Sequence, residues 1–279
     1  MGQLAGKCAV VTGATSGIGR RTVERFVDEG ARVVFCGRRE ALGVELQAQL
    51  GRERALFVKA DVTLEDDVAR VIGACVREFG RLDVLFNNAG GPAPTGGIET
   101  VPVAGFDAAM ATLVRSVMLG MKHAAPLMLA QKSGSIINNG SIAALRAGYS
   151  SSMVYSAAKA AVVHLSTCVA MQLGESGVRV NCISPGGIAT GIFGKALGLS
   201  TAAAEESAEA LKAGLARFQP IPRAGLPEDI ANAAVFLASD ASSFVNGHNL
   251  VVDGGVVGGR QWSALQQSLK GMKQAFGLE

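Results

Sequence analysis

The chain has 279 residues, of which 49% are hydrophobic and 18% are charged. It is long and apolar enough to bury a large core, and it carries too few charges to form long disordered arms. The 26 Lys and Arg residues exceed the 23 Asp and Glu residues by only three, which argues against nucleic acid as a main partner.

Short runs rich in Val and Ile alternate with longer segments of helical period. Continuous apolar strands joined by helices predict a parallel sheet that is buried on both faces. Right-handed crossovers then favour a single α/β domain, Rossmann-like and doubly wound, with helices on both faces. We expect strands at 8–12, 32–36, 55–60, 82–86, 134–138, 179–183 and 249–252, and helices at 18–29, 65–79, 105–131, 152–174 and 227–239.

The last third of the chain departs twice from this alternation. Residues 191–222 contain no strand pattern but include an Ala- and Glu-rich helical segment, which indicates a flap inserted into the domain. Residues 260–279 follow a Gly-rich exit and are amphipathic, with Trp262, Leu265, Leu269, Met272 and Phe276 at helical spacing. We therefore assign residues 1–259 to one domain. Residues 260–279 are assigned to a tail helix that packs on this domain or on a neighbouring subunit.

A glycine-rich loop follows the first predicted strand and opens the first helix. Gly13, Gly17 and Gly19 permit a tight turn, close approach of the backbone to a diphosphate, and close packing of helix on strand. The free N–H groups at the helix N-terminus favour anions. We expect a dinucleotide to contact Gly13, Thr15, Ser16, Gly17, Ile18 and Gly19.

The end of the second strand bears on which nicotinamide cofactor is preferred. The sequence Cys36-Gly37-Arg38-Arg39 offers no carboxylate for the ribose 2′-hydroxyl of NAD, whereas Arg38 or Arg39 could pair with the 2′-phosphate of NADP. The alternative is that both arginines only solvate the start of a helix. We favour NADP(H) over NAD(H). Further cofactor contacts are expected at the ends of the third and fourth strands, from Asp61, Val62, Asn88, Ala89 and Gly90.

A phenol and an ammonium group lie on one helix face, because Tyr155 and Lys159 are four residues apart. A neighbouring cation favours the phenolate, so we expect the pKa of Tyr155 to be lowered and the residue to act as an acid or base toward an alcohol or ketone. Ser141 follows the fifth strand, where its hydroxyl could bond the same carbonyl oxygen.

These residues together resemble the short-chain dehydrogenase/reductase family over roughly residues 5–255. The resemblance rests on the TGxxxGIG loop at 12–19, NNAG at 87–90, Ser141, YxxxK at 155–159 and PGGIAT at 185–190. It implies a seven-stranded Rossmann sheet, a homotetramer or homodimer, and hydride transfer at a carbonyl or secondary alcohol carbon. It also implies that Tyr155 is the acid/base, that Lys159 holds the nicotinamide ribose, and that Ser141 orients the substrate. By the same resemblance, the nicotinamide amide and phosphates would be lined by Pro185, Gly186, Ile188 and Thr190.

One position departs from the family pattern. Leu113 stands where many members carry an Asn that positions a water in the proton relay to the lysine. Leucine cannot form a hydrogen bond, so the relay would be slowed, rewired, or served by Ser116 or Thr112. A one-turn error in this alignment is the other interpretation.

The residues expected to face the substrate are mostly apolar, which favours a hydrophobic alcohol or ketone. An oxidoreductase is therefore the leading hypothesis, and the alternative is a nucleotide-binding sensor or scaffold that has lost turnover. The scattered cysteines, the lack of room for a signal peptide and the polar interruptions of segment 157–173 favour a cytoplasmic protein without a membrane span. The separated histidines predict no metal site. The expected substrate-facing residues are Ile142, Leu145, Tyr149, Met153, Gly187, Ile192, Phe193 and Leu197.

Overall fold

The Val- and Ile-rich segments form the strands of the computed structural model, which describes residues 2–278. Within these residues, seven strands form one parallel sheet in the order β3-β2-β1-β4-β5-β6-β7, so the predicted α/β fold class is confirmed. The order reverses direction between β1 and β4, as expected of a doubly wound sheet. The strands are β1 (Cys8–Val11), β2 (Arg32–Gly37), β3 (Ala55–Lys59), β4 (Val84–Asn87), β5 (Gly134–Asn139), β6 (Val178–Pro185) and β7 (Asn249–Val252).

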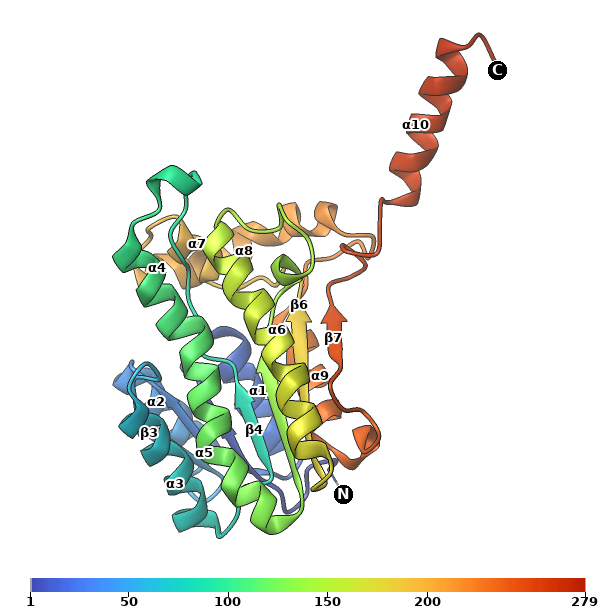
Figure 1. Ribbon diagram of the computed structural model, residues 1–279. Coiled ribbons are helices and arrows are strands. Elements are labelled where there is room, and N and C mark those ends of the chain that lie inside the picture. Colours follow the sequence, from blue (N-terminus) through green and yellow to red (C-terminus); the bar gives the residue numbers. More distant parts are fainter. Residues whose placement is uncertain (1, 279) are drawn as a thin grey trace.

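Helices cover both faces of this sheet (Figure 1). One apolar cluster joins α3, α5 and α6 to one face of the sheet, and a second joins α1, α2 and α9 to the other. Neighbouring residues of one strand alternate between the clusters: Val10 and its partner Val34 belong to the first, and Val11 and its partner Phe35 to the second. The covering helices are α1 (Gly17–Asp28), α2 (Glu40–Leu50), α3 (Glu65–Phe79), α5 (Ser116–Gln131), α6 (Met153–Gly174) and α9 (Pro227–Ala238).

The segment predicted as one helix at 105–131 contains an irregular turn. It consists of α4 (Val103–Met110), a π-helical turn at Ala111–Arg115, and α5. In this turn the Ser116 backbone N–H donates to the carbonyl of Ala111, and the Ser116 hydroxyl donates to the carbonyl of Thr112 at 2.6 Å. The hydroxyl thus gives that carbonyl a partner at the point where the regular helical ladder is interrupted.

Two segments, Val103–Gln131 and Met153–Gly174, are long and apolar enough to cross a membrane by length and composition alone. In this fold both lie along the same side of the sheet (Figure 1), and both contribute to its apolar cluster. Packing on the sheet accounts for part of their apolar content, since 33% of the most apolar window of each segment is buried.

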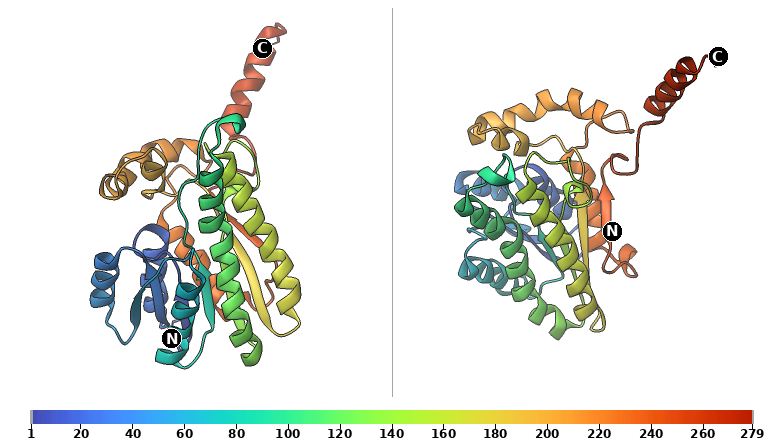
Figure 2. Two further views of the ribbon diagram at one scale, coloured as in Figure 1. Left: turned by 60° about the vertical axis from the view of Figure 1, so that its left-hand side comes forward. Right: turned by 45° about the horizontal axis from the view of Figure 1, so that its top comes forward.

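The flap and the tail lie outside the layers. The flap contains α7 (Ile192–Ala196) and α8 (Thr201–Phe218), which arch over the carboxyl ends of the strands (Figure 2). The tail forms α10 (Trp262–Ala275), which projects away from the domain, and every residue at 262–278 is exposed (Figures 1 and 2). The tail is helical, but it does not pack on its own domain. Packing on a neighbouring subunit is the alternative that stays open.

Candidate active site

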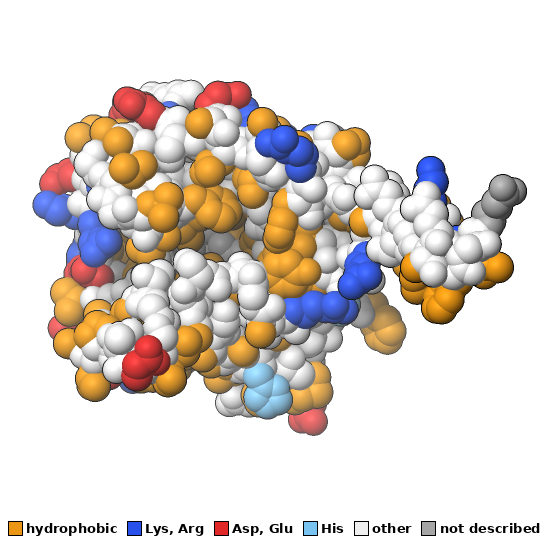
Figure 3. Space-filling view, turned by 90° about the horizontal axis from the view of Figure 1, so that it is seen from above, with side chains coloured by type: hydrophobic (Ala, Val, Ile, Leu, Met, Phe, Trp, Pro, Cys, Tyr) orange, Lys and Arg blue, Asp and Glu red, His pale blue; other side chains and the backbone are white. Residues whose placement is uncertain are grey.

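A cavity of about 510 Å³ opens at the carboxyl ends of the strands, next to the reversal between β1 and β4. Ligands of open α/β sheets bind at such a switch point. Seen from above, this end of the molecule is hollowed and carries many hydrophobic side chains around the hollow (Figure 3). The volume is within the usual range for ligand sites, which is roughly 300–1,000 Å³.

The floor of the cavity is the glycine loop, and it is shaped by close backbone approach. Gly13 and Gly17 have φ values of 67° and 55°, a region that glycine adopts without strain. A Cβ on Gly13 would lie 2.5 Å from the Cα of Ala89. Asn88 ties the fourth strand to this loop, because its side-chain amide donates to the carbonyls of Thr12 at 3.0 Å and Gly13 at 3.2 Å. The loop is thus a preformed cradle at the N-terminus of α1, where phosphate groups fit.

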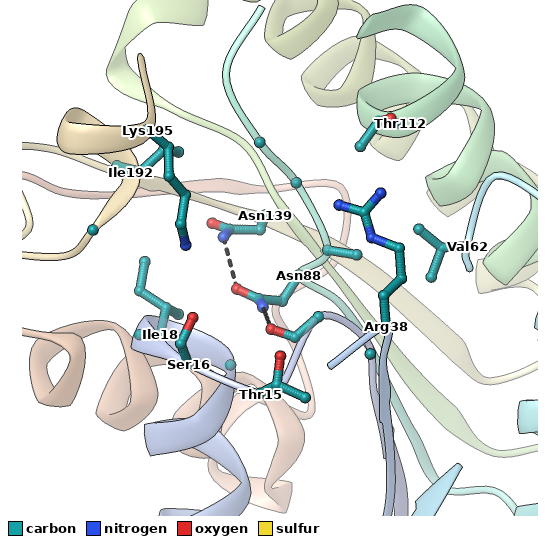
Figure 4. A pocket seen from close by; sticks show the side chains of 18 of the residues that line it. Thr15, Ser16, Ile18, Arg38, Val62, Asn88, Thr112, Asn139, Ile192 and Lys195 are labelled. Carbon is teal, nitrogen blue, oxygen red and sulfur yellow. Dashed lines mark hydrogen bonds between the residues drawn. The ribbon is translucent and has the colours of Figure 1, made fainter. Parts of the chain in front are cut away.

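The two arginines after β2 are placed differently. Arg39 folds onto the glycine loop, where its Nε donates to Thr15 Oγ1 at 3.0 Å and its Nη2 donates to Ser16 Oγ at 2.6 Å. The Arg38 side chain is 78% exposed, lines the cavity and lies 4.0 Å from Asp61 (Figure 4). A Cβ on Gly37 would lie 2.7 Å from Thr15 Cγ2, so this position has little room for a carboxylate side chain.

Most of the cofactor residues expected from the sequence line this one cavity. They are Gly13, Thr15, Ser16, Gly17, Ile18, Gly19, Arg38, Arg39, Asp61, Val62, Asn88, Ala89, Gly90, Tyr155, Lys159 and Thr190. Three others lie behind its wall. Pro185 pairs with Val252 in the sheet, the Gly186 N–H donates to the carbonyl of Val252 at 3.0 Å, and Ile188 is buried in the core. Their contribution to the cavity is therefore to its packing, not to its lining.

The three catalytic candidates converge at one end of the cavity. Ser141 follows β5, its Oγ accepts from the Ala143 N–H at 3.1 Å, and its side chain is close enough to Tyr155 to act on the pKa of the phenol. Tyr155 and Lys159 lie on one face of α6, and the Lys159 Nζ is 5.7 Å from the centre of the Tyr155 ring. The Lys159 ammonium also donates to the backbone carbonyl of Asn139 at 2.6 Å. The phenol and the ammonium group thus line the cavity, and the Ser141 side chain lies beside the phenol.

Burial dominates the titration of this group. Burial raises the pKa of Tyr155 above its ordinary value, and the hydrogen bond from Ser141 opposes this only in part. Burial also lowers the pKa of Lys159 to about 8. The expectation that Lys159 lowers the pKa of Tyr155 is therefore not met in this arrangement, because the loss of hydration dominates and only Ser141 opposes it.

Leu113 also borders the cavity. It is 1% exposed and lies in the π-helical turn, next to Thr112, which lines the cavity too. The Ser116 hydroxyl is engaged by the carbonyl of Thr112 inside the helix. Of the two groups considered as substitutes in a proton relay, Thr112 is thus the one that reaches the cavity.

Several lining residues were not expected from the sequence, among them Asn139, Lys195 and Glu205. Asn139 donates from its side-chain amide to Asn88 Oδ1 at 3.0 Å (Figure 4), and its own Oδ1 is buried without a hydrogen-bond partner within residues 2–278. The two consecutive asparagines at the end of β5, Asn138 and Asn139, were the available signal for Asn139. Lys195 and Glu205 lie on the flap, where charged residues on helices carry no signal that they face inward.

The residues expected to face the substrate are mostly apolar, but they differ in exposure. Leu145, Met153, Phe193 and Leu197 are exposed, whereas Ile142 is buried. Tyr149 packs edge-on against Phe218 of the flap, with ring centres 5.8 Å apart. Tyr149 therefore also anchors the end of the flap. Among residues 2–278, His, Cys, Asp and Glu side chains form no group of three that could hold a metal ion.

Several known proteins are similar to this chain in sequence or in fold. A family model described as enoyl-(acyl carrier protein) reductase matches residues 13–257. Momilactone A synthase from Oryza sativa subsp. japonica is 41% identical over 258 residues, covering 91% of each chain. The chain belongs to the short-chain dehydrogenase/reductase family. Another relative, (+)-borneol dehydrogenase 2 from Salvia officinalis, is 40% identical to this chain over 262 residues, which cover 91% of this chain and 90% of the relative. The crystal structure of levodione reductase superposes with a TM-score of 0.82 at 30% identity, covering 92% of this chain and 100% of that one.

The membership establishes a general activity. The similar proteins are named as dehydrogenases, reductases and synthases. The chain is therefore an oxidoreductase of the short-chain alcohol dehydrogenase/reductase type that uses a nicotinamide cofactor. Because the family model ends at residue 257, α10 lies beyond the residues that it matches.

Proposed function

We propose that this oxidoreductase interconverts a hydrophobic secondary alcohol and the corresponding ketone, with NADP(H) preferred over NAD(H) and Tyr155 as the acid/base. The observation that carries the proposal is that Tyr155 and Lys159, with Ser141 beside the phenol, line the same cavity as the glycine loop. The residues fit the cofactor, because the loop forms a cradle that a Cβ on Gly13 would fill and because Arg38, 78% exposed and 4.0 Å from Asp61, lies in the cavity at the end of β2, where a 2′-phosphate is expected.

Each side chain has a separate task in the proposed reaction. A bound nicotinamide cofactor supplies or accepts the hydride at the carbonyl carbon. In reduction, the Ser141 hydroxyl donates a hydrogen bond to the carbonyl oxygen, and the Tyr155 phenol transfers its proton to that oxygen as the alcohol forms. In oxidation the proton returns to the phenolate. The Lys159 ammonium holds the nicotinamide ribose and stabilises the phenolate electrostatically.

We predict a pH dependence from Lys159. Because burial lowers its pKa to about 8, the ammonium is present below that pH and lost as the pH rises through it. Ketone reduction should therefore fall as the pH rises from 7 to 9, since the phenol of Tyr155 stays protonated over this range. Measuring kcat/KM for reduction between pH 6 and pH 10 checks this. A rate that stays constant to pH 10 would show that Lys159 keeps its proton or does not contribute.

We predict that Arg38 selects the cofactor. Arg38→Ala should weaken NADPH binding by about tenfold to a hundredfold, because a charged hydrogen bond to the 2′-phosphate is lost. NADH, which lacks that phosphate, should be little affected. Arg52→Ala is the matched control, because Arg52 is also exposed and pairs with Glu78 at 3.7 Å. Equal losses for NADPH and NADH in Arg38→Ala would contradict the assignment, and tighter binding of NADH by the unaltered protein would contradict the cofactor preference.

The proposed substrate class rests on the hydrophobic side chains that gather around the hollow (Figure 3), and on the exposure of Leu145, Met153 and Phe193, three residues expected to face the substrate. One similar protein is named as a dehydrogenase of (+)-borneol, and another as a reductase of levodione. These names support small alcohols and ketones as substrates. A spectrophotometric scan of apolar ketones and secondary alcohols tests the activity. Cofactor binding without turnover across such a panel would instead support a sensor or scaffold, for which Leu113 is the sequence feature.

We further propose that the protein is cytoplasmic and forms a homotetramer or homodimer. Four of its five cysteines are buried as free thiols, which is consistent with a reducing compartment. Met118, Leu129 and Met171 are exposed on α5 and α6, and a shared helical interface would cover such side chains. Light scattering on the purified protein measures the assembly.

A further inference from the structure

A carboxylate of the flap lies among the cations of the proposed cofactor site. Glu205, on α8, lines the cavity, and its Oε1 accepts from Lys195 Nζ at 2.7 Å. The same oxygen lies 3.4 Å from Arg39 Nη1, and the Ser16 side chain is close enough to the carboxylate to help lower its pKa. The Glu205 side chain is only 32% exposed. One flap residue therefore bridges the flap, the end of β2 and the glycine loop.

The Glu205 carboxylate lies where a phosphate group of the cofactor would bind favourably. Ser16 is the residue that precedes α1, and its backbone is extended there. Free N–H groups and the partial positive charge of a helix N-terminus attract anions, and Arg39 is fixed beside them by Thr15 and Ser16. Lys195 extends into the cavity from the flap side (Figure 4). A cofactor phosphate and the Glu205 carboxylate would thus be held by the same groups.

Close packing of α7 on α8 within the flap holds Glu205 beside the glycine loop. α7 and α8 approach each other through glycines: a Cβ on Gly191 would lie 2.9 Å from the Glu205 carboxyl carbon, and one on Gly194 would lie 2.8 Å from the Cα of Ala204. Because the two helices pack this closely, a displacement of Glu205 would be transmitted to α7, which carries Lys195 and Ile192. Both of these residues line the cavity.

We propose that Glu205 is an internal competitor of the cofactor phosphates: its carboxylate and the phosphate oxygens contend for Arg39, Lys195 and Ser16. The inference rests on the proposed function, in which the cavity holds a nicotinamide dinucleotide. Binding then requires Glu205 to give up these partners, which lowers cofactor affinity. During release, the carboxylate takes them back and speeds dissociation.

The charge of Glu205 supports this role. Burial alone would raise its pKa, but hydrogen bonds from Lys195, Ser16 and Arg39 outweigh burial and hold the pKa below the ordinary value. The residue is therefore an anion at neutral pH, and it repels phosphate as well as occupying its partners.

Glu205→Gln tests the proposal, because it removes the charge while keeping the shape. Glu206→Gln is the matched control, since Glu206 is the next residue of α8, is exposed and makes the same change in net charge. Fluorescence titration gives the Kd for NADPH and NADH, and stopped-flow displacement gives the dissociation rate. We expect Glu205→Gln to bind NADPH about tenfold more tightly and to release it more slowly, with Glu206→Gln unchanged.

The outcomes separate this inference from the proposed function. Equal or weaker NADPH binding by Glu205→Gln would overturn the competition, because the carboxylate would then be neutral or favourable to the cofactor. If the unaltered protein prefers NADH, only the cofactor preference fails, and the same comparison with NADH still decides the role of Glu205. If the unaltered protein binds neither dinucleotide, the proposed function and this inference both fail.

Discussion

Replacing Tyr155 with Phe is expected to lower the turnover number about 10²- to 10⁴-fold, the usual contribution of a general acid or base. The change removes one hydroxyl, the group that lies beside Ser141 and that transfers the proton in the proposed reaction. The Phe ring keeps the packing on α6, so cofactor affinity should stay within a few-fold of the unaltered protein. Steady-state kinetics with an accepted ketone, together with an NADPH titration, measure both quantities.

The chain offers a matched control for this experiment, because it contains only two tyrosines. The Tyr149 hydroxyl donates to the backbone carbonyl of Val256 at 3.3 Å. Tyr149→Phe should therefore cost about 1 kcal/mol of stability and leave most of the turnover. If Tyr155→Phe also retained most of the turnover, proton transfer by Tyr155 would be excluded.

Replacing Gly13 with Ala is expected to lower the free energy of unfolding by about 2–4 kcal/mol, among the larger effects of single substitutions. Two penalties combine at this position. The backbone has a φ of 67°, which costs a residue with a Cβ about 1 kcal/mol or more. The added Cβ would also lie 2.5 Å from the Cα of Ala89, and a backbone atom can move aside only if the loop after β4 shifts.

Gly6→Ala separates the two penalties. Gly6 has a φ of 77°, but a Cβ there would meet no atom within 4 Å. It should lose only the conformational contribution, about 1 kcal/mol. Urea unfolding of both variants at one protein concentration measures the difference, and an NADPH titration should show that Gly13→Ala alone loses cofactor binding. Equal destabilisation by the two substitutions would show that the loop after β4 accommodates the added methyl group.

Local patterns in the sequence determined the layers of this fold. Fully apolar strands such as Cys8–Val11 can form only where both faces of a sheet are covered, so they predicted a parallel sheet between two layers of helices. The π-helical turn at Ala111–Arg115 was missed, because it has the same composition as the regular helix on either side. Its identity depends on which backbone N–H pairs with the Ala111 carbonyl.

By itself, the sequence determined the groups whose geometry is local: the glycine loop, whose turn needs Gly13 and Gly17, and the pair Tyr155 and Lys159, which one helical turn places on the same face. Only the tertiary structure decided the interactions between distant segments. Arg39 and Glu205 are 166 positions apart, and nothing in either segment encodes their contact. The direction of the Tyr155 pKa was also decided there, since burial depends on every element packed around the ring. Spacing along one helix reveals which groups are neighbours, but hydration and long-range contacts arise only when the whole chain has folded.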